Sequence, residues 1–218
     1  MSTRGRYSKE LRGVFDNLVL MCRHIEAAME KCIRALTELD FELAREVCEE
    51  DAVIDKMERE IEQSCLKILV MEQPMAGDFR EVSAALKMIT DLERIGDQAR
   101  DIAEITTKLG EEGQVSKLVN IPRMAGIAIQ MVKDGVQAYI NRDLALARSL
   151  EKTDDKVDEL FDIIMADLTA LIKRDPDSAG RVILLMMIAK YLERIGDHAI
   201  NIGEWVEYAI TGIHPKQG

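Results

Sequence analysis

Carboxylate side chains recur at intervals of four residues in the first half of the chain. Glu93, Asp97 and Asp101 follow this spacing, and so does the earlier pair Asp51 and Asp55. Residues four apart lie on the same face of an α-helix, so each set would form one acidic stripe. Carboxylates that converge from facing helices bind metal ions in helical bundles. The chemistry that this pattern allows is therefore metal binding through oxygen ligands.

The second half of the chain carries the same pattern. Glu193, Asp197 and Asn201 correspond to the later stripe, and Asp154 with Asp158 corresponds to the earlier pair. Ligands that are nearly all oxygen favour Mg, Mn, Fe or Ca over a dedicated zinc site. The spacing leaves the metal open among divalent and trivalent ions, and Zn stays among the candidates beside Fe, Mn and Mg.

A solvated helix face is the competing interpretation of the acidic stripes. Like charges four residues apart destabilise a helix by roughly a few tenths of a kcal/mol unless a cation neutralises them. Asp97 has Arg94 and Arg100 within one helical turn, and Asp55 has Arg59. Considered alone, the spacing favours this solvated face over a metal site.

An internal duplication moves the balance toward the metal site. The motif Leu-Glu-Arg-Ile-Gly-Asp occurs at 92–97 and again at 192–197, and nine of the thirteen residues from 92 to 104 recur one hundred positions later. Both copies keep Glu-x-x-x-Asp, whereas Arg100 is replaced by Ile200, which removes an ion-pair partner of the solvated face. Selection on the carboxylates explains this pattern more simply than chance does.

A glycine interrupts each copy of the motif. Glycine inside a helix costs about 0.5 to 1 kcal/mol relative to alanine, so it indicates that another backbone or a ligand comes close. Gly96 and Gly196 therefore support a binding site. A tight crossing of two helices explains them equally well.

Helices must position these residues, because apolar side chains recur at spacings of three and four along the chain. Six helices are expected, at residues 8–39, 41–71, 78–108, 116–141, 143–174 and 178–210. Asp40 and Ser178 are expected N-caps, and Asp78 with Glu81 forms a capping-box pattern. The fold class that follows is all-α, with three helices on either side of mid-chain.

The chain divides at its middle into two units. The polar segment 110–116 is the expected linker between a first three-helix repeat at 1–109 and a second at 117–218. No segment approaches the roughly 18 apolar residues of a membrane span, and no secretory signal is evident. The four cysteines include no Cys-x-x-Cys pair and are expected to be buried thiols in a reducing compartment. We therefore expect a soluble cytoplasmic protein.

The net charge of -11 argues against a nucleic-acid-binding protein, because neutralising phosphates requires a basic face. No nucleophile with a paired base and no glycine-rich phosphate loop occurs, so enzymatic activity has little support. A di-metal carboxylate oxidoreductase is the enzymatic alternative, but none of His24, His198 and His214 completes the Glu-x-x-His pattern of such enzymes. A purely structural helical scaffold is the other alternative.

Three segments resemble the PhoU family of phosphate-signalling regulators. They are the turn Gln-Pro-x-Ala-x-Asp-Phe-Arg at 73–80, the motif at 92–97 and its second copy, and the resemblance extends in order over nearly the whole chain. It implies two three-helix bundles related by pseudo-symmetry, with multinuclear metal sites built from (Glu/Asp)-x-x-x-Asp motifs. Carried over by position, the implied ligands are Asp51, Asp55, Glu93, Asp97, Asp101, Asp154, Asp158, Glu193, Asp197 and Asn201.

Two departures from the family pattern lie in the second half. Asn201 stands where the first half has Asp101, so the second site should carry one less negative charge and bind metal more weakly. The second half also lacks the Gln-Pro-x-Ala-x-Asp turn, and has the sequence Asp-Pro-Asp-Ser at 175–178 instead.

The function that the resemblance implies is regulatory rather than enzymatic. Such a protein would link the phosphate-specific ABC transporter, through its ATPase, to a membrane-bound sensor histidine kinase. It would be a negative regulator that helps to keep the phosphate-starvation response off when phosphate is plentiful. We expect it to work at the inner face of the membrane as a homodimer, with peripheral membrane association only.

Overall fold

The structure is a computed structural model that describes residues 3–110 and 120–215. The described residues form six long helices and one short 3-10 helix, which are α1 (Thr3–Glu38), α2 (Phe41–Glu72), α3 (Gly77–Leu109), α4 (Asn120–Asn141), α5 (Leu144–Arg174), η1 (Pro176–Ser178) and α6 (Ala179–Thr211). The all-α prediction is confirmed. The predicted start of the fourth helix at Ser116 and all but the first residue of the predicted linker lie outside the described residues, so the repeat boundaries stay a prediction.

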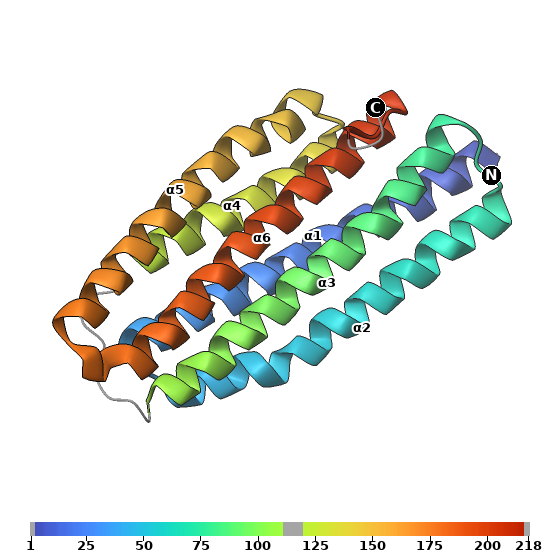
Figure 1. Cartoon of the computed structure of the whole chain (residues 1–218). Helices are drawn as coiled ribbons and strands as arrows, with labels where there is room; N and C mark the ends of the chain where they lie inside the picture. The colour runs from blue at the N-terminus through green and yellow to red at the C-terminus, as the bar shows by residue number, and fades with distance from the viewer. Residues whose placement is uncertain (1–2, 111–119, 216–218) are drawn as a thin grey trace.

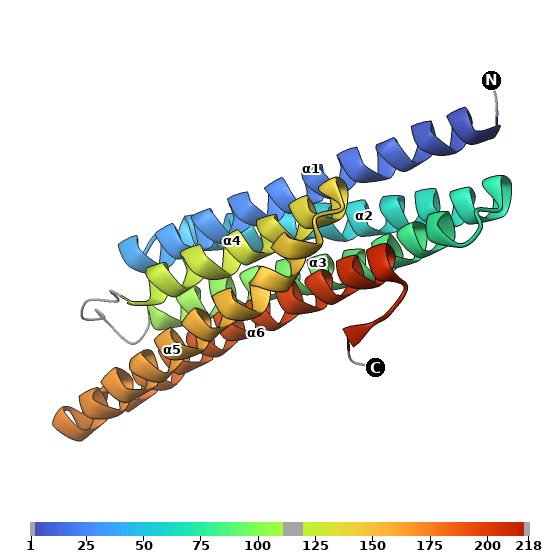
Figure 2. The same ribbon diagram turned by 90° about the horizontal axis from the view of Figure 1, so that it is seen from above.

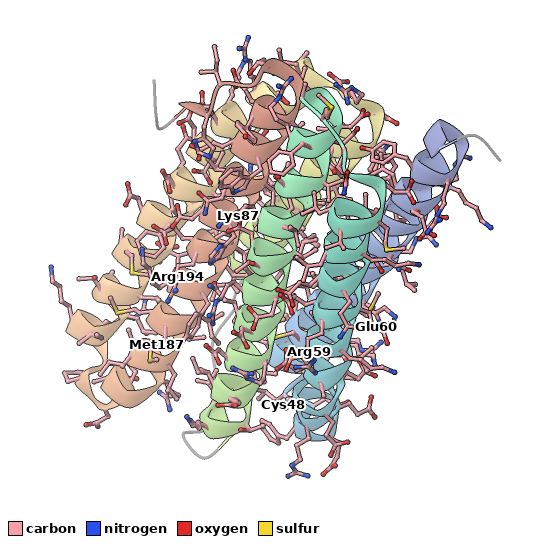
Figure 3. All side chains as sticks on the ribbon, turned by 90° about the vertical axis from the view of Figure 1, so that its right-hand side faces the viewer. Cys48, Arg59, Glu60, Lys87, Met187 and Arg194 are labelled. Carbon is pink, nitrogen blue, oxygen red and sulfur yellow. The ribbon has the colours of Figure 1, made fainter. Side chains whose placement is uncertain are left out.

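The helices form two groups of three that meet along α3 and α6 (Figure 1). These two helices lie side by side and run in opposite directions, and the α2–α3 and α5–α6 turns therefore lie at opposite ends of the molecule (Figures 1 and 2). Seen from the side, α3 lies between α6 and α2 (Figure 3). Contacts between α5 and α6 extend this layer, while α1 and α4 pack on it and on each other.

Apolar stripes at helical spacing hold the two groups together. Leu92 and Ile95 of α3 and their counterparts Leu192 and Ile195 of α6 are fully buried. Because each pair belongs to the repeated motif, the same six-residue motif supplies core residues on one face of its helix and acidic residues on another. The duplicated sequence therefore fixes the position of the carboxylates relative to the hydrophobic core.

Equivalent aspartates begin the middle helix of each group. The Asp40 carboxylate accepts a hydrogen bond from the Leu43 backbone N–H at 3.0 Å, and Asp143 accepts one from the Leu146 N–H at 2.9 Å. Side-chain caps of this kind satisfy backbone donors that a helix leaves free at its first turn. The predicted cap at Asp40 is confirmed.

The predicted capping box at Asp78 is wrong. Helix α3 begins at Gly77 after Ala76, whose φ of 48° takes the chain sharply into the helix, and no side chain caps this end. Glu81 cannot reach back, because its carboxylate pairs with Arg142 at 2.9 Å. The hydroxyl of Tyr139 also donates to the Glu81 carbonyl oxygen at 2.6 Å. Glu81 therefore contacts Tyr139 of α4 and Arg142, which follows α4, instead of the N-terminus of its own helix.

Ser178 occupies the predicted N-cap position of α6, but its side chain does not cap the helix. Its hydroxyl instead donates to the Asp175 carbonyl oxygen at 2.6 Å, within the turn that contains Pro176. The short 3-10 helix therefore replaces the side-chain cap at this terminus.

The cysteines are free thiols in the first group of helices. Cys22, Cys32 and Cys65 are buried as predicted, and Cys48 is half-buried. Burial raises the pKa of Cys22 to about 11 and of Cys65 to about 12. Such thiols stay protonated at neutral pH and act as small apolar side chains.

No helix in the described ranges has the length and hydropathy needed to cross a bilayer.

Candidate metal centres

The first acidic cluster lies where α2 meets α3. Helix α2 contributes Asp51 and Asp55, and α3 contributes Glu93 and Asp97. The side chain of Asp51 is only 9% exposed. Burial raises the pKa of Glu93, and the charges of Asp97 and Asp55 raise it further. The structure therefore brings the two predicted acidic stripes of the first half together.

A guanidinium group occupies the middle of the first cluster. Arg100 donates from Nη1 to Asp51 at 2.7 Å, across the gap between the helices, and the same nitrogen lies 2.9 Å from Asp97. Its Nη2 lies 3.4 Å from Asp101, and its Nε lies 3.8 Å from Glu104. Burial raises the pKa of the Asp51 carboxyl, and the hydrogen bond from Arg100 opposes that shift. The first cluster thus contains its own counter-charge.

Arg94 and Arg59, the other cations of the solvated-face interpretation, differ in whether they pair with a carboxylate of the first cluster. Arg94 pairs with Asp97 at 3.0 Å and lies 3.5 Å from Glu93, at the exposed rim. Arg59, on α2 (Figure 3), is exposed and forms no ion pair with Asp55 among the described residues. Within the described residues, Asp55 is therefore the carboxylate of the first cluster that has no cation paired with it.

The second acidic cluster lies where α5 meets α6 and has no such cation inside it. Burial, together with the charges of Asp158, Asp197 and Glu193, raises the pKa of Asp154 to about 6. Burial and the Glu193 charge also raise the pKa values of Asp158 and Asp197. Such shifts mark carboxylates that are partly buried and repel one another, and the Lys190 charge offsets the shifts of Asp158 and Asp197 only in part. Lys190 pairs with Glu193 at 2.5 Å but stays more than half exposed at the rim.

The two motif glycines, Gly96 and Gly196, each allow a different kind of side chain to approach the helix backbone. A Cβ atom built on Gly196 would lie 2.6 Å from the Asp154 Oδ1 atom, so glycine lets this carboxylate lie against α6. At Gly96 the nearest atom would be Cγ2 of Ile54, at 3.0 Å. Both explanations of the glycines therefore apply: in the second half, glycine admits a carboxylate of the candidate site, and in the first half it admits a core side chain.

Asn201 turns toward the other repeat. Its amide nitrogen donates to Asp91 of α3 at 3.2 Å, and His198 Nδ1 lies 2.8 Å from the same carboxylate oxygen. Asp101, the counterpart of Asn201, likewise reaches the α3–α6 contact, where burial and then its charge raise the pKa of Tyr191. Asp91 escaped the sequence analysis because it belongs to no repeated acidic pair. These positions connect the repeats at the edge of each cluster.

The oxygen atoms of the clustered carboxylates are the type of ligand that a hard metal ion binds. In the parts of the chain that the structure describes, no three His, Cys, Asp or Glu side chains are already arranged to hold a metal ion. The second cluster nevertheless gathers four carboxylates from two helices, and burial together with neighbouring negative charges raises the pKa values of Asp154, Asp158 and Asp197. The second cluster therefore contains the carboxylate oxygen atoms that a hard metal ion prefers as ligands.

Asparagine in place of Asp154 should stabilise the metal-free protein. The pKa of this carboxyl is raised in the folded state from 3.8 to about 6, so the ionised form that prevails at neutral pH destabilises the fold. Because the carboxyl is partly open to solvent, screening limits the gain to about 1 kcal/mol. Urea unfolding in the presence of a chelator should give a higher midpoint for Asp154→Asn than for the wild type.

The pH dependence provides the check on that result. A carboxyl pKa raised from 3.8 to about 6 predicts that the wild-type protein gains stability as the pH falls from 6 toward 4. The Asp154→Asn variant should lack this part of the gain. Asp167→Asn, on an exposed site of α5, is the matched control. Equal pH profiles for the wild type and Asp154→Asn would contradict the proposed repulsion.

Comparison with known proteins gives one consistent family. The PhoU domain model matches residues 18–106 and 121–206. The chain is 34% identical over 211 residues to a phosphate-specific transport system accessory protein PhoU homolog of Clostridium acetobutylicum, covering 96% of each chain. It is 37% identical over 186 residues to the homolog of Aquifex aeolicus, covering 85% of this chain and 84% of that one. The crystal structure of PhoU from Pseudomonas aeruginosa superposes with a TM-score of 0.89 at 34% identity, covering 95% of this chain and 100% of that one.

Proposed function

Because this chain belongs to the PhoU family, we propose that it is an accessory and regulatory protein of a phosphate-specific transport system. Within that role we propose a metal-binding signalling adaptor. It would act as a negative regulator of the phosphate-starvation response, between the transporter ATPase and a sensor histidine kinase. The protein would act at the cytoplasmic face of the membrane and would not catalyse a reaction.

The observation that carries the metal part is the second acidic cluster. Burial and the proximity of four carboxylates from two helices raise the pKa values of three of them. Among the described residues, Asp154, Asp158 and Asp197 form no ion pair. A protein gains nothing in stability from such an arrangement unless a cation neutralises it. A bound metal ion would supply that charge and would tie α5 to α6.

The adaptor part is supported by what the relatives are and by the charge of this chain. A net charge of -11 favours encounter with basic partner surfaces and opposes binding to nucleic acid. Metal loading would change the local charge by two or more units on the layer formed by α2, α3, α6 and α5. A change of that size alters which partner surface is complementary, so metal and partner binding would be coupled.

The test combines elemental analysis with a cellular readout. Protein purified without chelator should contain Mn, Fe, Mg or another hard metal, and the double variant Asp97→Asn plus Asp197→Asn should contain less. In cells, the same variant should turn on a phosphate-starvation reporter while phosphate is plentiful. Glu159→Gln plus Asp167→Asn, which removes the same charge from exposed sites of α5, should leave both results unchanged.

The outcomes separate the two parts of the proposal. A metal-free wild type whose double variant still represses the reporter would refute the metal part and leave the adaptor part standing. Normal repression in a strain that lacks the gene would refute the adaptor part. The homodimer expected from the family resemblance stays a prediction, and analytical ultracentrifugation would decide it.

A further inference from the structure

Arg100 distinguishes the two acidic clusters more sharply than any ligand difference does. Its guanidinium makes contacts with four carboxylates, which come from both α2 and α3. Only 34% of its side chain is exposed. Burial lowers the pKa of Arg100, but the hydrogen bond to Asp51 and the charges of Asp51, Asp97 and Asp101 together raise it by more, so the group stays cationic. A fixed positive charge therefore sits among the oxygen atoms that a metal ion would use.

The second cluster has an apolar residue at the same position. Ile200 packs against the hydrophobic core and leaves the space beside the carboxylates without a cation. Asp154 accordingly lies against Gly196, whereas its counterpart Asp51 is held by Arg100. The nearest cation of the second cluster, Lys190, contacts Glu193 from the rim and is 54% exposed. Solvent screens such a group far more than it screens a half-buried arginine.

A guanidinium and a metal ion compete for the same oxygen atoms. For a metal ion to bind the first cluster, Arg100 must give up its hydrogen bonds to Asp51 and Asp97, or two positive charges must share the site. Charge-assisted bonds to carboxylates are among the strongest polar contacts in proteins. In the second cluster the competing contact is the one between Lys190 and Glu193, and the cost of losing it is smaller because Lys190 lies at the exposed rim.

We propose that Arg100 takes the place of a metal ion in the first cluster, so that the second cluster binds metal first and the first binds it only after Arg100 is displaced. This inference rests on the proposed metal binding and adds an order of filling to it. The order is the reverse of the one expected from Asn201 alone. That residue is occupied with Asp91, so its missing charge weakens the second cluster less than Arg100 weakens the first.

Exchanging the two residues tests the proposal. Arg100→Ile gives the first cluster the residue of the second, and Ile200→Arg does the reverse. Titration of the chelator-treated protein with Mn²⁺, with free Mn²⁺ followed by electron paramagnetic resonance, should show a stronger and a weaker class of sites in the wild type. Arg100→Ile should strengthen the weaker class by about tenfold or more, and Ile200→Arg should weaken the stronger class by a similar factor.

Controls separate the loss of a charge from the loss of this contact. Arg45→Ile removes an exposed arginine that pairs with Glu42 in the first turn of α2, and it should change neither class. Should the buried arginine of Ile200→Arg prevent folding, Arg100→Ile and Arg100→Gln decide the question by themselves. Two unchanged classes in these variants would overturn the role of Arg100 while leaving metal binding in place. No Mn²⁺ binding by the wild type would overturn both.

Discussion

The double variant Asp154→Asn plus Asp197→Asn should lose Mn²⁺ affinity at the second cluster by about a hundredfold or more. Both carboxylates belong to the group whose mutual repulsion a metal ion would relieve, and each contributes negative charge as well as an oxygen ligand. Asparagine keeps the shape and one oxygen atom but removes the charge. Isothermal titration calorimetry on chelator-treated protein measures the loss directly.

The stability of the same variant distinguishes a binding site from a folding defect. Removing mutually repelling carboxylates should make the metal-free protein more resistant to urea while metal affinity falls. Asp51→Asn in the first cluster should stabilise the protein less, because the same change removes the charge from the shortest contact of the half-buried Arg100. A variant of the second cluster that loses both affinity and stability would instead indicate damage to the fold.

The helices and the duplication could be predicted because both depend on local patterns. Apolar spacing places each helix, and the caps at Asp40 and Asp143 need only residues three positions apart. The capping-box prediction at Asp78 was wrong because it too used only a local pattern, whereas Glu81 pairs with Arg142, which follows α4 and is distant in the sequence. A local sequence pattern contains no information about ion pairs with residues that are distant in the sequence.

The acidic residues of the candidate sites could also be predicted, but the difference between the sites could not. Sequence comparison shows that Arg100 is replaced by Ile200, and it cannot show that the arginine reaches across to α2. Likewise, the antiparallel contact of α3 with α6 brings Asn201 to Asp91, although these residues lie 110 positions apart in the chain. Each of these contacts depends on how two helices are packed, which no spacing within one helix encodes.

The close approach of α5 to α6 should be the feature of the second cluster that is most sensitive to a single substitution. A Cβ atom on Gly203 would lie 2.9 Å from the Leu150 Cδ1 atom and 3.1 Å from the Ala147 carbonyl oxygen. The counterpart in the first repeat is the buried Ala103, so only the second repeat requires glycine here. The Ala147 oxygen is backbone and cannot rotate away, which means that a larger residue must push the helices apart.

Gly203→Val should therefore lower the free energy of unfolding by about 3 kcal/mol. Because α5 carries Asp154 and Asp158, its displacement should also weaken Mn²⁺ binding at the second cluster while the first cluster keeps its affinity. Urea unfolding and Mn²⁺ titration measure the two effects, and Gly203→Ala provides a milder change if valine prevents folding. Gly126→Val is the matched control, since nothing lies within 4 Å of a Cβ atom there and stability should not fall. Unchanged metal binding in a destabilised Gly203→Val protein would show that the second cluster does not depend on how closely α5 packs against α6.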